Sequence, residues 1–115
     1  MLLEEQNQNP GQKLGRIAED MGLISDEQLI QDYKKTLNHV INRVNTLTGV
    51  PYREDKAILC WETGNELDST PEWTSNICRY IKELDRNHLT MDGFFAFDDV
   101  PVRESSVKDP YVDII

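Results

Sequence analysis

One unbroken apolar run, Ala57-Ile-Leu-Cys-Trp61, constrains the fold more than any other stretch of this sequence. A strand with one face in water alternates apolar and polar residues, whereas a strand of a parallel sheet that helices cover on both faces reads as a continuous apolar run. Thr70 and Pro71 follow as the cap and first residue of a helix. The pattern predicts a strand followed by a helix, as in parallel α/β structures.

Two amphipathic helices are predicted around this strand. Ser25 and Gln28 have the spacing of a capping box, which marks the start of the first of these helices. Gly49 is a typical stop and marks its end. Its apolar stripe comprises Leu29, Tyr33, Leu37, Val40, Ile41, Val44 and Leu47. The second helix begins at Thr70 and ends at 85–87, with a stripe comprising Trp73, Ile77, Tyr80, Ile81 and Leu84.

Two further strands are predicted after the second helix. Residues 88–97, "HLTMDGFFAF", give a strand that opens into a loop at Gly93, and residues 111–115, "YVDII", begin another. Strands that are apolar on both faces need helices on both sides and neighbours at both edges. Three strands and about three helices cannot supply these, so we expect a piece of a larger α/β domain. The alternative is a small sheet that closes by pairing with another copy.

Composition limits the partners. The 115 residues include 12 basic and 21 acidic residues, a net charge of −9, which argues against nucleic acid because phosphate binding depends on Lys and Arg. No apolar run reaches the ~18 residues that span a bilayer, so no membrane partner is expected. The first residues lack a secretory signal, which indicates a cytoplasmic chain unless a leader has been lost. Cys60 and Cys78 are isolated and are expected to be reduced thiols; no cofactor or metal site is indicated.

Asn65 and Glu66 lie where the apolar strand ends, in "WETGNELDST". Residues just past the carboxyl ends of parallel strands face the crevice where ligands bind. Gly64 would let the backbone turn there. The alternative is a polar loop whose acids face the positive end of the next helix. Glu62 is about 13 Å of extended chain from Glu66, so it is interpreted as a structural acid bonded to backbone or to an arginine.

Three stretches together resemble glycoside hydrolase family 5, particularly its endo-β-1,4-mannanase branch. They are "YKKTLNHVINRVNTLTGVPYREDKAILCWETGNEL", "WTSNICRYIKELDRNHLTMDGFFAF" and "DPYVDII", within residues 26–115. Family members have a helix ending in "NRVNTxTG" and a fourth barrel strand reading "I-A-W-E-x-x-N-E-P". The resemblance implies a partial (β/α)₈ TIM barrel over residues 26–115, from helix three to strand six. Residues 1–25 lie outside it: residues 1–13 are polar, and Leu14, Ile17, Ala18 and Met21 recur at helical spacing, so a polar tail and a short helix are predicted there.

The resemblance also implies roles. Glu66 aligns with the general acid/base of a retaining hydrolase, and Asn65 with the asparagine that binds the sugar 2-hydroxyl or the nucleophile. Leu67 stands where the family usually has proline. The nucleophile is expected at the end of strand seven, beyond this sequence, so the chain is expected to be inactive alone. A polysaccharide, β-1,4-mannan or a related β-glycan, would be the substrate of the complete enzyme.

Other polar and aromatic residues are assigned lesser roles. Asp92, Asp98 and Asp99 are expected to be solvated loop acids, with peripheral sugar contact as the alternative. The aromatic rings of Phe94, Phe95 and Phe97 fit either core packing or stacking on a sugar. His39 and His88 are expected to be structural.

The segment "LGRIAEDMGLISDEQL", residues 14–29, is similar to the start of the N-terminal domain of type II secretion and type IV pilus ATPases. Some of those domains bind cyclic di-GMP through such segments. This similarity implies an alternative function, a small binding module whose leading helices recognise a nucleotide or a protein partner.

Overall fold

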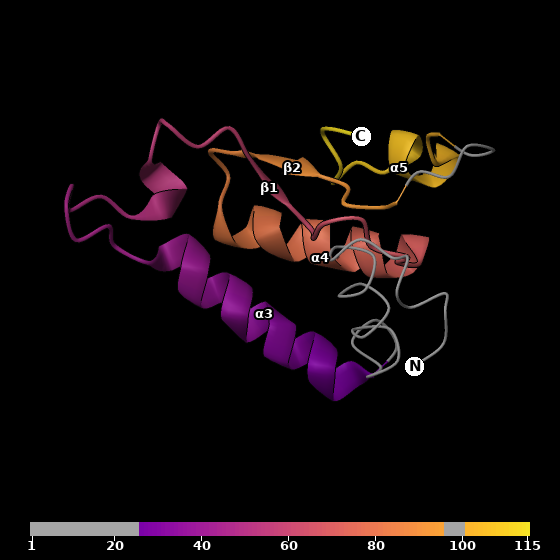
Figure 1. Cartoon of the computed structure of the whole chain (residues 1–115), viewed down its shortest axis with the longest axis horizontal. Helices are drawn as coiled ribbons and strands as arrows, with labels where there is room; N and C mark the ends of the chain where they lie inside the picture. Colours follow the sequence, from indigo (N-terminus) through magenta and orange to yellow (C-terminus); the bar gives the residue numbers. More distant parts are fainter. Residues whose placement is uncertain (1–25, 96–100) are drawn as a thin grey trace, which may run out of the picture.

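A computed structural model describes residues 26–95 and 101–115 of the chain, and Figure 1 shows their arrangement. The elements in chain order are α3 (Glu27–Asn42), the 3-10 turn η1 (Tyr52–Glu54), β1 (Cys60–Glu62), α4 (Pro71–Leu84), β2 (Leu89–Met91) and α5 (Glu104–Lys108). The tail and short helix predicted for residues 1–25, the ATPase-like segment up to residue 25, and Asp98, Asp99 and Phe97 lie outside the described residues.

The first predicted helix is present as α3, but both of its predicted ends are wrong. Asp26, not Ser25, is the N-cap, because its carboxylate accepts the amide of Leu29 at 3.1 Å. Gln28, which was expected to close the capping box, instead donates to Asp32. The helix ends at Asn42, so Val44 and Leu47 lie beyond it and are exposed; Val44 forms an antiparallel bridge with Pro51, and Leu47 lies in the turn between them. The apolar spacing continued in the sequence after the helix had stopped.

The second helix forms as predicted. Thr70 caps α4 by accepting the amide of Trp73 at 3.2 Å, and Pro71 occupies the first turn. Because Pro has no N–H to donate and its φ is already helical, it suits this position. Asp85 ends the helix. The core consists of the buried side chains Ile30, Ile41, Trp73, Ile77 and Ile81, which join α3 to α4.

β1 and β2 pair in parallel, with Trp61 opposite Thr90, so the predicted βαβ unit is confirmed. Both strands are shorter than the apolar runs that predicted them. The third predicted strand is reduced to one parallel bridge between Met91 and Ile114, supported by hydrogen bonds to the backbone of Thr90 and Asp92.

Helices cover one face of the strand pair among the described residues. In Figure 1, α4 lies against the strands and α3 lies alongside α4, both on the same side. Trp61 and Thr90 point toward α4, where Trp61 packs on the core and Thr90 is fully buried. Leu89, on the alternate face, is 40% exposed. Some residues of the continuous apolar run therefore lie on the strand face that no described helix covers, which fits a partial barrel.

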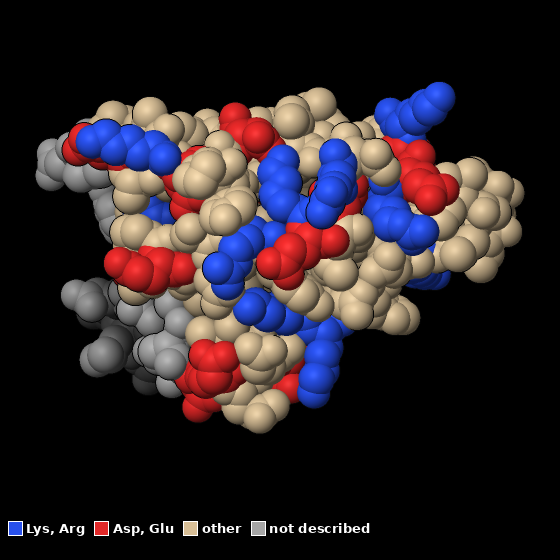
Figure 2. Space-filling model, turned by 180° about the vertical axis from the view of Figure 1, so that it is seen from behind, with Lys and Arg blue, Asp and Glu red and all other residues tan. Residues whose placement is uncertain are grey.

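No helix among the described residues is both long and apolar enough to cross a membrane. Figure 2 shows the molecule from behind, with acidic side chains lying among the basic ones. Two of the exposed pairs on the helices are Arg79 with Glu83, at 3.9 Å, and Lys35 with Asp32, at 3.5 Å. Exposed ion pairs of this kind contribute ~0–1 kcal/mol each, so the helices are held mainly by their apolar stripes.

Candidate active site

Asn65 and Glu66 lie in the loop between β1 and α4, residues 63–70, which we call the β1–α4 loop. The loop leaves the carboxyl end of β1 and passes beside the end of β2, which runs in the same direction. Asn65 is exposed and Glu66 is half-buried. Both residues therefore lie at the rim formed by the carboxyl ends of the parallel pair, the position at which ligands bind in α/β structures.

Glu66 has an unusual backbone conformation. Its φ of 52° is in the left-handed region, and among the described residues it is the one non-glycine with a positive φ. This conformation costs an L-residue about 1–2 kcal/mol, and such costs cluster at sites where function requires them. The conformation persists only if neighbouring contacts impose it.

Backbone hydrogen bonds fix the residue that follows Glu66. The amide of Leu67 donates to the carbonyl of Gly93 at 2.8 Å, and the carbonyl of Leu67 accepts from Phe95 at 2.8 Å. Leu67 and Phe94 form a parallel bridge, so the strand pairing resumes beyond the turn at Glu66. A proline at this position would have no N–H to donate, so Leu67 supplies a contact that the usual proline of the resembled family could not.

Two glycines allow the ends of the strands to approach closely. A Cβ on Gly93 would lie 1.8 Å from the carbonyl oxygen of Gly64, which is a fixed backbone atom. The amide of Gly93 donates to the hydroxyl of Thr63 at 2.9 Å, and the amide of Thr63 donates to Met91 at 3.1 Å. The β1–α4 loop is thus attached to the end of β2 at Thr63 and again at Leu67.

Tyr33 supports the start of the loop from α3. Its hydroxyl donates to the carbonyl of Thr63 at 2.6 Å, and its ring stacks on Trp73 with centroids 5.7 Å apart. Burial, with a smaller contribution from Cys78, raises the pKa of Tyr33 to about 12, so the hydroxyl keeps the proton that it donates. The end of β1 is therefore held from both α3 and α4.

Asp92 is not the solvated loop acid that the sequence predicted. It is 8% exposed and lies at the end of β2, where its carboxylate binds Arg103 at 2.9 and 3.1 Å. Ser106 also donates to it, and the guanidinium of Arg103 lies over the ring of Phe94, 3.9 Å from the centroid. The prediction failed because the partner of Asp92 comes from a segment 11 residues later that carries no periodic signal.

Arg103 is a residue that sequence reasoning missed. It is 9% exposed, and its guanidinium also donates to the carbonyl of Ser69 at 2.5 Å and to the hydroxyl of Thr74 at 2.9 Å. We call Asp92, Arg103, Ser106, Ser69 and Thr74 the Asp92 cluster. The available signal was a single basic residue in "DDVPVRESS", next to a predicted strand end with an acid.

Glu62 also differs from its prediction. It was expected to bond to backbone or to an arginine, but its side chain is exposed and makes no hydrogen bond or ion pair with any other described residue. Trp61 beside it points toward α4, so Glu62 lies on the alternate face of the pair, which the helices leave uncovered. Glu62 therefore has no structural partner in this part of the chain.

The opposite end of the strand pair carries a buried polar network. The indole of Trp61 donates to Asp85 at 2.7 Å, and the two ring nitrogens of His88 lie 2.6 Å from Asp85 and 2.7 Å from the carbonyl of Asp55. Burial would lower the pKa of His88, but its hydrogen bonds to Asp55 and Asp85 outweigh that effect and raise the pKa. His88 is structural, as predicted.

The pKa of Asp85 is lowered. Burial opposes this shift, and hydrogen bonds from Trp61, His88 and the amide of Asn87 overcome it. The network ties the end of α4 to the start of β2, at the amino ends of the strands. None of its residues lies in the β1–α4 loop, so we interpret the network as part of the scaffold rather than of the candidate site.

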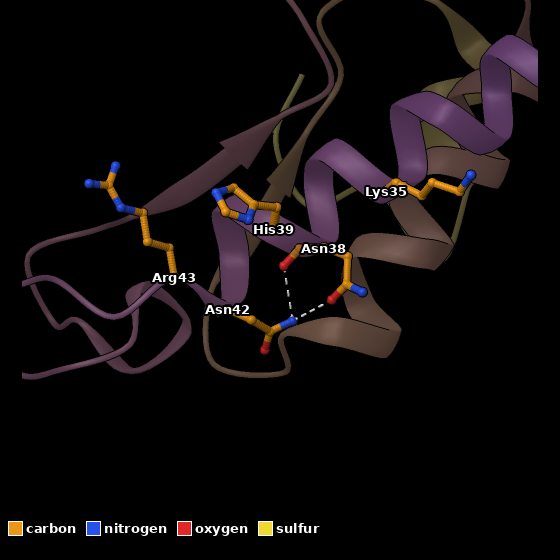
Figure 3. Close-up of a pocket in the computed structure, with 5 residues that line it drawn as sticks. All are labelled: Lys35, Asn38, His39, Asn42 and Arg43. Carbon is orange, nitrogen blue, oxygen red and sulfur yellow. Dashed lines mark hydrogen bonds between the residues drawn. The ribbon is translucent and has the colours of Figure 1, made fainter.

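A shallow hollow of about 400 Å³ lies over the last turns of α3 (Figure 3). Its lining consists of Lys35, Asn38, His39, Asn42 and Arg43, all exposed. Asn42 donates to the backbone and side chain of Asn38, whereas Lys35 and Arg43 point away from each other. The hollow lies at the end of α3 that leads to the amino end of β1, where ligand sites of parallel α/β folds are not found.

Both cysteines are free, as expected, and burial raises the pKa of the Cys78 thiol to about 12. Within residues 26–95 and 101–115, no group of three or more His, Cys, Asp or Glu residues could hold a metal ion. At the strand rim, the β1–α4 loop carries the carboxylate of Glu66 and the amide of Asn65.

Comparison with known families gives one match that covers most of the chain. The family described as "GH family 5 beta-mannosidase-like" matches residues 15–108 of this chain. Mannan endo-1,4-β-mannosidase 5 of Solanum lycopersicum is 34% identical over 84 residues, covering 64% of this chain and 20% of that protein. Mannan endo-1,4-β-mannosidase 7 of Arabidopsis thaliana is 38% identical over 80 residues, covering 62% of this chain and 19% of that protein.

Solved structures agree with the sequence relatives. The endo-β-1,4-mannanase of Thermotoga petrophila superposes with a TM-score of 0.63 at 36% identity, over 71% of this chain and 21% of that one. The endo-1,4-β-mannanase of Rhizomucor miehei gives a TM-score of 0.60 at 32% identity, over 66% of this chain and 26% of that one. The chain thus spans about a fifth of the length of the curated relatives that it matches.

Proposed function

Since the chain belongs to the β-mannosidase-like members of glycoside hydrolase family 5, we propose that it forms the acid/base-bearing segment of a retaining hydrolase of β-1,4-mannan or a related β-glycan. Glu66 is the general acid/base in this proposal, and Asn65 binds the sugar. The observation that carries it is the position of Glu66, in a left-handed backbone conformation immediately past the carboxyl end of a parallel strand.

The proposed chemistry uses Glu66 twice. Its protonated carboxyl gives a proton to the glycosidic oxygen as the bond to the leaving sugar breaks. Its carboxylate then takes a proton from the water that attacks the glycosyl-enzyme and releases the sugar. Asn65, one residue earlier on the exposed side of the loop, donates its amide N–H to the sugar 2-hydroxyl or to the nucleophile. Both side chains need a rigid loop, which the contacts at Thr63 and Leu67 supply.

A retaining mechanism also needs a second carboxylate, about 5–5.5 Å from the first. We assign no residue of this chain to that role. Glu62 lies in the strand rather than in the loop, and Asp92 is occupied by Arg103. The resemblance to the family implies a glutamate at the end of strand seven as the nucleophile, so the proposal places it outside these 115 residues, and the chain by itself is expected not to hydrolyse mannan.

The inactivity is tested with the purified chain and a chromogenic mannoside. We expect no release of chromophore above buffer. Release that the Glu66→Gln variant abolishes would contradict the expectation, because it would show that the 115 residues hold a complete site.

The role of Glu66 is tested in a hybrid in which the part of this chain that superposes on the Thermotoga petrophila mannanase, 71% of the chain, replaces the corresponding segment of that enzyme. Glu66→Gln in an active hybrid is expected to lower kcat/KM on mannan by ~10²–10⁴-fold, the usual contribution of general acid/base catalysis. Glu62→Gln, the same change four residues earlier, is the control and is expected to leave kcat/KM unchanged. Equal activity of both variants would contradict the assignment.

A further inference from the structure

We propose that Arg103 is a positioning residue for Glu66, which holds the β1–α4 loop in its strained conformation by tying Ser69 to Asp92 at the end of β2. The inference rests on the proposed role of Glu66. Arg103 makes no hydrogen bond or ion pair with Glu66 or Asn65, so its effect is carried by the loop backbone.

The contacts of Arg103 join three parts of the chain. One guanidinium nitrogen donates to the carbonyl of Ser69, in the loop. The other lies 2.9 Å from the Asp92 carboxylate at the end of β2 and 2.9 Å from the Thr74 hydroxyl in the first turn of α4. The loop, the strand end and the helix start are therefore held by a single side chain.

These contacts are protected from water. The side chain of Arg103 is 9% exposed and that of Asp92 is 2% exposed. A charge-assisted hydrogen bond is stronger in a buried site of low effective dielectric constant, and a carboxylate left there without its partner is strongly unfavourable. The surroundings consequently favour one arrangement of the Asp92 cluster, and Ser69 has little freedom to move relative to β2.

The left-handed φ of Glu66 needs a restraint of this kind. Leu67, the next residue, is held to Gly93, and Gly93 adjoins Asp92. Ser69, three residues after Glu66, is held to Asp92 through Arg103. Glu66 thus precedes two successive attachments to the same strand end, so the loop cannot extend to relieve the strain.

An arginine suits this position and a lysine does not. The planar guanidinium presents donors in several fixed directions, which reach Ser69, Thr74 and Asp92 together while its face lies on the ring of Phe94. The third guanidinium nitrogen, Nε, is buried and has no hydrogen-bond partner among the described residues. This orphaned donor indicates that the side chain is placed for its terminal contacts.

The test measures the backbone of Glu66 in the 115-residue chain by NMR. In Arg103→Lys, the scalar couplings that report φ of Glu66 are expected to leave their left-handed values, and the amide of Leu67 is expected to exchange with solvent at least about tenfold faster. Amides of Ile77 and Ile81, within α4, are expected to keep their protection. Lys108→Ala, which removes an exposed cation from the same segment, is the control and should change neither quantity.

A second variant separates positioning from a general loss of stability. Arg103→Gly leaves a space that free guanidinium ion can enter, and millimolar guanidinium is expected to restore the Glu66 couplings and the slow exchange of Leu67. Unchanged couplings in Arg103→Lys, equal loss of protection throughout α4, or no recovery with guanidinium would each overturn the proposal. Because these readouts require no turnover, they remain decisive even if the hybrid enzyme disproves the catalytic role of Glu66.

Discussion

Glu66 combines a carboxylate at the strand rim with a backbone conformation that glycine adopts far more easily. If the left-handed φ serves to position the Glu66 carboxylate and costs stability, then replacing Glu66 by a residue without a side chain should relieve strain. We expect Glu66→Gly to raise the free energy of unfolding by up to ~1 kcal/mol. Urea denaturation followed by circular dichroism measures this.

The matched control for that variant is Glu62→Gly, the same change at an ordinary strand position. Glycine in a strand loses more backbone entropy on folding, so this variant should lower the free energy of unfolding by ~0.5–1 kcal/mol. Destabilisation of similar size by both variants would show that the left-handed conformation carries no strain.

Gly93 sets the closest backbone approach in the site. A methyl group there would meet the Gly64 carbonyl at 1.8 Å, and neither backbone can move without breaking the hydrogen bonds of Thr63 and Leu67. Gly93→Ala is expected to lower the free energy of unfolding by about 3 kcal/mol. Gly49→Ala, at a φ of 71° with nothing within 4 Å, isolates the conformational cost alone and should lose ~1 kcal/mol. Thermal and urea denaturation of both variants measure the difference.

Among the elements, α4 was predicted most completely because its signals are local. The cap at Thr70, Pro71 in the first turn and the stripe of Trp73, Ile77 and Ile81 are all within one segment, and the structure confirms each. The end of α3 was wrong because Val44 and Leu47 continue the apolar spacing although the chain has already turned. Periodicity reports which residues could share a face, not where the helix stops.

The loops that build the candidate site depend on contacts between distant residues, so the sequence predicted them less well. The position of Asn65 and Glu66 after a strand was readable, because the strand and the following helix cap both have local signals. The burial of Asp92 was not, since it depends on Arg103 folding back from beyond the strand. Glu62 was misjudged for the same reason: nothing in one sequence shows whether a cationic partner lies nearby.

The junction between α4 and β2 should make stability depend on pH. The raised pKa of His88 means that its contribution is complete below the ordinary value of 6.5 and is lost as pH rises through the folded-state pKa. The lowered pKa of Asp85 means that its contribution is complete above 3.8 and is lost as pH falls through its folded-state pKa. Stability should therefore be greatest between these two values.

Unfolding by urea at a series of pH values checks this dependence. We expect the free energy of unfolding to fall by ~1–3 kcal/mol above the window, as the charge-assisted contact of His88 with Asp85 is lost. His88→Asn should remove that alkaline decline, and His39→Asn, at the exposed histidine of α3, should preserve it. A decline that persists in His88→Asn would assign the effect to another group.

For the whole molecule, the uncovered face of the strand pair has the largest consequence. Cys60, Glu62, Leu89 and Met91 share this face, and helices cover only the other one in the described residues. Of these side chains Leu89 is apolar and exposed, and exposed apolar surface favours association. We propose that copies of the isolated chain pair through this face, where a complete barrel would place its own interior.

Sedimentation velocity over a range of concentrations tests the pairing. The chain is expected to sediment as a dimer or larger species as concentration rises, and Leu89→Lys should return it to a monomer. Val107→Lys, on α5 at a position 59% exposed, is the control and should not change the distribution. A monomer at all concentrations would show that the uncovered face does not drive association.

The central claim, that Glu66 is the acid/base of a retaining glycosidase segment, is tested most directly by azide rescue of Glu66→Ala in the hybrid with the Thermotoga petrophila mannanase. An activated aryl mannoside needs no acid to leave, so the variant should accumulate a glycosyl-enzyme that water attacks slowly without its base. Azide, which needs no base, is predicted to restore turnover and give a mannosyl azide of retained β-configuration. No acceleration by azide, or a product of inverted configuration, would contradict the account.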